Sequence, residues 1–102
     1  MFLFGEKKRL LIEFANRTAE ELTKDVPSEI VEQHLLGKSK KSSKKFTAGV
    51  DKAFQRISAF KASEKPGLYG KAKLHQVFAS RLHELGYPTE IVDEINSFML
   101  TN

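Results

Sequence analysis

Cysteine and tryptophan are absent from this chain of 102 residues, and only three prolines interrupt it. The lack of cysteine excludes disulfides and thiolate metal sites, so side-chain packing, a partner or a ligand must hold the fold together. No apolar run exceeds four residues, whereas a membrane-spanning helix needs about 20. The apolar opening Met1–Phe4 precedes basic residues, the reverse of a secretory leader. We therefore expect a cytoplasmic protein that has no membrane partner.

The residues that are present favour a helical protein. Apolar residues make up 40% of the chain and charged residues 29%, a composition that can bury a core. No stretch alternates apolar and polar residues for long enough to indicate a strand. We predict an all-α fold with one helical domain over residues 1–102, a single compact bundle of four to five short helices.

Five segments carry the helical pattern, and their ends carry the matching signals. Ser28 and Thr89 are predicted N-caps, Gly37 is a predicted left-handed C-cap, and Leu35 is expected to be buried. His34, His75 and His83 are expected at partly exposed polar positions. The predicted helices run from about residue 6 to 24, 28 to 36, 46 to 63, 71 to 85, and from 89 onward.

Between the second and third predicted helices lies a block of five lysines and three serines, residues 38–45. The block offers no apolar side chain to a core, so we predict a flexible, solvated basic loop within the domain.

Charge is strongly segregated along the chain. Residues 1–35 contain five basic and seven acidic side chains, residues 36–82 twelve and two, and residues 83–102 none and four. The middle segment therefore has a formal charge of +10 between two acidic ends. Such an asymmetry suits either an anionic partner or charge pairing within the molecule.

The candidate site is a basic face that would contact nucleic-acid phosphates. Affinity would depend steeply on salt and little on base sequence. Of the aromatic side chains, Tyr69 and Tyr87 are the ones expected to be free to stack on bases, so recognition of single strands is disfavoured. The residues predicted to form this face are Lys38, Lys40, Lys41, Lys44, Lys45, Lys52, Arg56, Lys71 and Lys73.

A second candidate element is a phosphate-binding turn at Gly67 and Gly70, where a helix would begin beside two lysines. An ordinary turn between helices is the alternative interpretation. Residues 66–72, Pro-Gly-Leu-Tyr-Gly-Lys-Ala, resemble the Pro-Gly-aliphatic-Gly-x-x-Ala hairpin of helix-hairpin-helix DNA-binding motifs, which holds a phosphate on backbone N–H groups. This chain departs from that pattern by the inserted Tyr69 and by Ala72, which follows Gly70 by two places instead of three.

The sequence carries no pattern for catalysis. The histidines lack metal-ligand spacing, and no cysteine or well-placed serine could act as a nucleophile. We expect no enzymatic activity, catalytic residue, metal or cofactor. Two functions remain: a small nucleic-acid-binding protein, or a protein-interaction module or homo-oligomer that uses charge-segregated helices and the apolar residues Phe2, Leu3 and Phe4.

Overall fold

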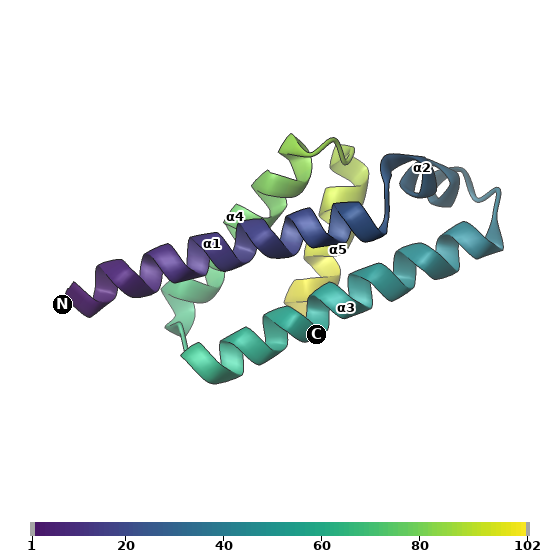
Figure 1. Cartoon of the computed structure of the whole chain (residues 1–102). Helices are drawn as coiled ribbons and strands as arrows, with labels where there is room; N and C mark the ends of the chain where they lie inside the picture. The colour runs from purple at the N-terminus through teal and green to yellow at the C-terminus, as the bar shows by residue number, and fades with distance from the viewer. Residues whose placement is uncertain (1, 102) are drawn as a thin grey trace.

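The chain folds into helices joined by short turns (Figure 1). The computed structural model describes residues 2–101, with side chains from Glu6 to Leu100. Within that range the fold is all-α, as predicted, and its two longest helices have 24 and 25 residues. The described residues form five helices: α1 (Phe2–Asp25), α2 (Ser28–Leu36), α3 (Lys40–Glu64), α4 (Gly67–Glu84) and α5 (Thr89–Thr101).

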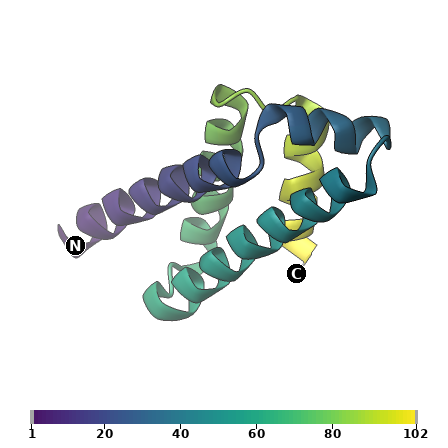
Figure 2. The same ribbon diagram turned by 45° about the vertical axis from the view of Figure 1, so that its right-hand side comes forward.

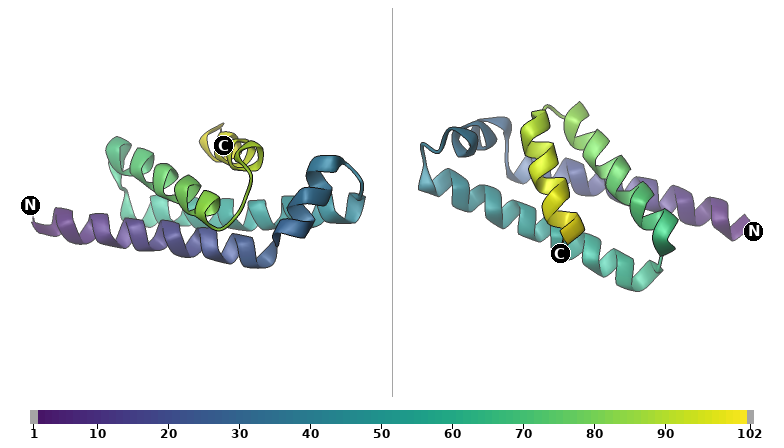
Figure 3. Two further views of the ribbon diagram at one scale, coloured as in Figure 1. Left: turned by 90° about the horizontal axis from the view of Figure 1, so that it is seen from above. Right: turned by 180° about the vertical axis from the view of Figure 1, so that it is seen from behind.

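The helices form two layers. α1 and α3 lie side by side in opposite directions along a body of 50 × 23 × 18 Å (Figure 1). α4 and α5 pack together as an antiparallel pair (Figure 2) and cover one face of the first layer (Figure 3). The short α2 joins α1 to α3 at one end of the body and packs on α3. The two ends of α3 therefore lie at opposite ends of the molecule.

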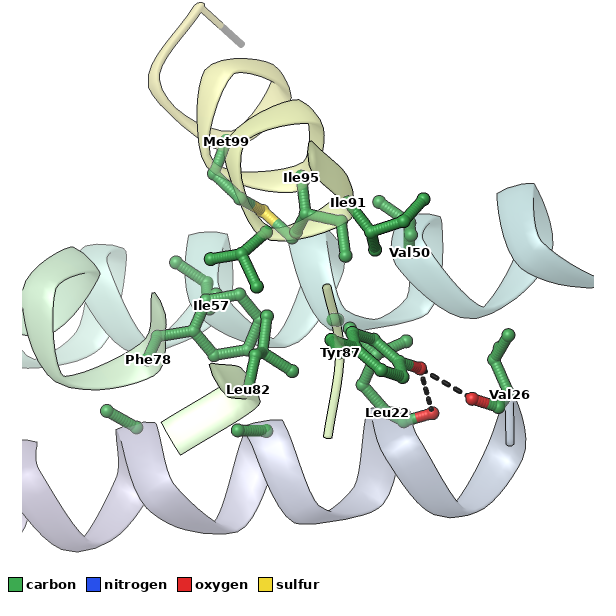
Figure 4. Close-up of a cluster of buried hydrophobic side chains, with 14 of the residues drawn as sticks. Leu22, Val26, Val50, Ile57, Phe78, Leu82, Tyr87, Ile91, Ile95 and Met99 are labelled. Carbon is green, nitrogen blue, oxygen red and sulfur yellow. Dashed lines mark hydrogen bonds between the residues drawn. The ribbon is translucent and has the colours of Figure 1, made fainter. Parts of the chain in front are cut away.

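The core lies between the layers and is built from apolar side chains that recur at helical spacing. On α1, the fully buried Ala15 and Ala19 offer small side chains where α4 packs. Large side chains from the other helices fill the remaining volume (Figure 4). One prediction is wrong: Leu35 on α2 is 39% exposed, because the buried side of that helix is formed by Val31 and the half-buried Ile30.

The side chain of Tyr87 links the end of α1 to the connection between α4 and α5 by a hydrogen bond, which we call the clasp. Tyr87 was expected to be available for stacking, but only 2% of it is exposed. Its hydroxyl donates to the backbone oxygen of Val26 at 2.6 Å and lies 3.4 Å from that of Leu22 (Figure 4). Val26 directly follows the last residue of α1, where carbonyl oxygens have no helical donor, whereas Leu22 O also accepts from the Val26 N–H. The clasp therefore supplies a hydrogen bond to Val26 O that the backbone of α1 does not make.

α2 and α5 begin in the same way, although not with the predicted hydroxyl caps. Ser28 and Thr89 are already helical, and the first backbone bonds are accepted one residue earlier by Pro27 and Pro88. A proline fits this position because its fixed backbone angle suits a helix entry and it has no N–H to leave unpaired. Gly37 ends α2 with a φ of 65°, the predicted left-handed cap.

The predicted flexible loop at residues 38–45 is wrong for most of its length, because Lys40 is the first residue of α3. Ser39 caps this helix, accepting a hydrogen bond at 3.1 Å from the backbone N–H of Ser42. Ser42 is buried, and its hydroxyl donates to the Gln33 side chain of α2 at 2.5 Å. A capping serine and one buried small residue suffice to continue the helix through the lysines, which have good helix propensity.

Candidate anion-binding surface

The first part of the predicted basic face is held together at the start of α3. We call Lys38, Lys40, Lys41, Lys44 and Lys45 the α3-start lysines. All five are exposed, and among the residues the structure describes none of the five forms an ion pair. The turn beneath them is fixed on α2, where the His34 ring stacks on Phe46 and its Nδ1 lies 2.9 Å from the Ser43 hydroxyl. Four of the five lysines thus project from an ordered helix, and Lys38 lies in the short connection before it.

The helix itself adds to the positive charge of this end. Four lysines fall within the first six residues of α3, and its first turn contains no acidic side chain. A helix N-terminus carries a partial positive charge that acts within the first turn, so Lys40 and Lys41 each lower the stability of the fold by about 0.3–1 kcal/mol. The arrangement raises the positive potential at this end at the expense of stability.

Lys52 and Arg56 do not extend the α3-start lysines. The two side chains are one turn apart on α3 and meet two carboxylates one turn apart on the antiparallel α1. Lys52 Nζ lies 3.8 Å from Asp25, and Arg56 is paired with Glu21. The predicted residues therefore do not form one unpaired face, because the middle of the run serves the contact between α1 and α3.

Lys71 and Lys73 lie at the other end of the molecule, on the first turns of α4. The rise of α3 places this end about 36 Å from the α3-start lysines. A groove of about 620 Å³ opens there between α1, α3 and α4, and we call it the α4 groove. Its lining includes Lys73, which belongs to the predicted basic face, and three lysines that do not: Lys7, Lys8 and Lys65.

The predicted phosphate-binding turn lies inside a helix. Gly67 is the first residue of α4 and has a φ of 77°, which favours glycine. Gly70 belongs to the same turn, where a side chain would press on Pro66 and approach Leu11. Only Lys65 and Pro66 lie between the two helices, so the resemblance to a helix-hairpin-helix loop does not extend to the backbone. Close packing accounts for Gly70, which also lines the α4 groove.

One of the three histidines is buried, contrary to the prediction of a partly exposed position. His75 is 4% exposed, and its Nε2 accepts a hydrogen bond from Lys61 Nζ at 2.8 Å. Because an ammonium only donates, the ring proton sits on Nδ1, which is buried without a partner. Burial, reinforced by the Lys61 charge, lowers the pKa of His75; burial and the nearby Lys71 lower the pKa of Lys61. The spacing of His75 from Phe78 and Leu82 would have placed it on the buried face.

In the described structure, no acidic side chain forms an ion pair with the α3-start lysines or with the lysines of the α4 groove. Glu94 of α5 lies 3.4 Å from His34, and Glu90 and Asp93 are exposed without an ion pair in the described structure. Arg81 bridges Glu20 and Glu84, and hydrogen bonds to Glu20 raise its pKa further.

Within the described residues we find no group of three or more candidate metal ligands, and none of the helices is both long and apolar enough to span a membrane.

Comparison of this chain with protein-family models, with curated proteins and with solved structures gave no match.

Proposed function

We propose that this protein is a non-enzymatic nucleic-acid-binding protein whose principal contact is made by the α3-start lysines. The observation that supports this function is their crowding on an ordered, exposed helix start without carboxylate partners in the described structure. Nucleic-acid backbones present closely spaced phosphates that could engage several of these ammonium groups at once. Such contacts hold the backbone and read little base sequence.

The test is charge reversal at the exposed Lys40 and Lys41, measured by fluorescence anisotropy with a labelled duplex over a range of salt concentrations. Each lysine that contacts a phosphate contributes about one unit to the slope of log affinity against log salt. Lys40→Glu/Lys41→Glu should therefore weaken binding and reduce that slope by about two. Glutamate suits a helix N-terminus better than lysine, so the variant should fold at least as well as the wild type.

A matched control is Arg17→Glu/Lys24→Glu, which makes the same change in net charge on the exposed side of α1. If the control weakens binding as much as the α3 variant, net charge alone explains the affinity and the assigned surface is wrong. If the wild type fails to bind duplex or single strands at low salt, nucleic-acid binding itself is refuted.

Self-association is a second candidate function, favoured by an apolar groove of about 810 Å³ between α3 and α5. Phe46, Val50 and Ile95 line it, with Lys40 and Glu94 among the charged residues around them. Exposed apolar side chains on neighbouring elements, Leu36 and Leu100, would add to such a contact. The side chains of the predicted apolar tag, Phe2 to Phe4, lie outside the described residues. Light scattering at micromolar concentration tests this candidate, and a monomer at every concentration and salt would refute it.

A further inference from the structure

The α4 groove combines cations with exposed aromatic surface. This combination distinguishes it from the α3-start lysines. Tyr69 stands in its lining with 68% of its surface exposed. Beside it, the half-buried Phe60 also lines the groove, and its ring stacks on that of Phe14 with ring centroids 4.2 Å apart. Leu11 and Pro66 complete an apolar floor. The groove therefore offers a flat apolar surface that is surrounded by lysine side chains.

Charge defines what kind of molecule would complement this surface. Four lysines line the groove, against the single carboxylate of Glu64. None of these lysines has an ion-pair partner within the described structure. The lysines come from α1, α4 and the connection before α4, so the charges converge from different elements. An occupant must then carry negative charge together with a flat apolar part.

A nucleotide of a single strand has both features. Its base can stack on an aromatic ring, and its flanking phosphates can meet ammonium groups. A volume of about 620 Å³ is in the range of pockets that hold small organic ligands, so one nucleotide fits. A base in a continuous duplex keeps both faces stacked on its neighbours and cannot enter such a groove without being unstacked. An acidic peptide could satisfy the lysines, but it would give the exposed ring no comparable partner.

We propose that the α4 groove holds one unstacked nucleotide of a single-stranded nucleic acid, with its base on Tyr69 and its phosphates on Lys7, Lys8, Lys65 and Lys73. The inference rests on the proposed function, because the α3-start lysines supply the main electrostatic contact. It revises the expectation that single strands are disfavoured: Tyr87 is buried, but Tyr69 is exposed beside four cations. The protein then favours single strands, or single-stranded ends, over a blunt duplex.

The experiment compares Tyr69→Ala with the wild type on two labelled probes, a mixed-sequence single strand of about 12 nucleotides and a duplex of the same sequence. Loss of one base–aromatic stack should weaken single-strand binding roughly 5- to 150-fold. Duplex binding should change less than about twofold, because stacking makes no contribution there. Tyr69→Phe keeps the ring and should retain single-strand affinity. Leu68→Ala is the matched control, since Leu68 is a neighbouring exposed residue outside the groove lining.

Each result decides between the two proposals. If Tyr69→Ala leaves single-strand binding unchanged while Lys40→Glu/Lys41→Glu weakens both probes, the groove is not a nucleotide site and the proposed function stands. If Tyr69→Ala and Leu68→Ala weaken both probes equally, a general effect on the α4 start explains the loss and the inference is wrong. If the wild type binds neither probe, both proposals are refuted.

Discussion

Replacing Tyr87 with phenylalanine tests the clasp between α1 and the α4–α5 connection. The ring stays in the core, and the change removes only the hydroxyl that donates to Val26 at 2.6 Å. Leu22 O keeps its backbone donor, Val26 N–H, at 2.8 Å. Val26 O loses its donor in a fully buried residue. An orphaned buried carbonyl costs about 1–3 kcal/mol, which is the expected fall in the free energy of unfolding.

Thermal and urea unfolding, followed by circular dichroism, measure this change. Each kcal/mol corresponds to about 4–8 °C in Tm for a domain of this size. The control is Tyr69→Phe, which alters an exposed hydroxyl and should shift the free energy of unfolding by less than about 0.5 kcal/mol. A loss below about 0.5 kcal/mol for Tyr87→Phe would refute the clasp.

Alkaline pH gives an independent check on the same residue. Burial, with a smaller contribution from Asp25, raises the pKa of Tyr87 above its ordinary value of about 10. The neutral phenol is therefore preferred in the folded state, and its stabilising effect is complete below pH 10 and is lost as the pH rises further. The stability difference between the wild type and Tyr87→Phe should shrink above about pH 10. A difference that stays constant to higher pH would contradict the assigned burial.

Three further changes probe other parts of the structure. Gly49→Ala should lower the free energy of unfolding by about 1–3 kcal/mol, because a side chain there would collide with Val26. An increase in that free energy, measured by denaturant unfolding, would contradict the close packing of α1 on α3. Burial lowers the pKa of His75, so the wild type should become less stable as the pH falls below about 6.5, by at most about 1.4 kcal/mol per pH unit. His75→Leu should abolish that decline in the free energy of unfolding, measured between pH 8 and pH 5. Ser39→Ala should cost about 1 kcal/mol and speed amide exchange in the first turn of α3, and unchanged exchange would refute the cap.

The helical spacing of buried apolar residues can be recognised in the sequence because it reflects the contact geometry directly. On α3, Phe46, Val50 and Ile57 recur at helical spacing, and all three are buried. The start of that helix escaped prediction because a lysine-rich turn contributes almost no apolar area. Its real signal was Ser39, a capping residue whose acceptance of the Ser42 N–H is visible only once the helix start is known.

The candidate site was harder to predict than the fold because it depends on which side chains meet. Whether Arg56 contacts a phosphate or Glu21 is set by the antiparallel alignment of α1 and α3, and no local pattern encodes that alignment. The α4 groove likewise brings Lys8 beside Lys65 and Lys73, residues far apart in the sequence. Charge counts located the basic segment but not the subset of its cations left unpaired.

The packing of α1 on α4 has a consequence for synthesis of the chain. α4 begins at Gly67, so more than forty residues follow α1 before its partner helix starts to leave the ribosome. Until then α4 cannot cover the stripe that includes Leu11, Ala15 and Ala19. We expect nascent chains that end before Gly67 to bind chaperones or aggregate, and release from that state should coincide with emergence of the α4 sequence.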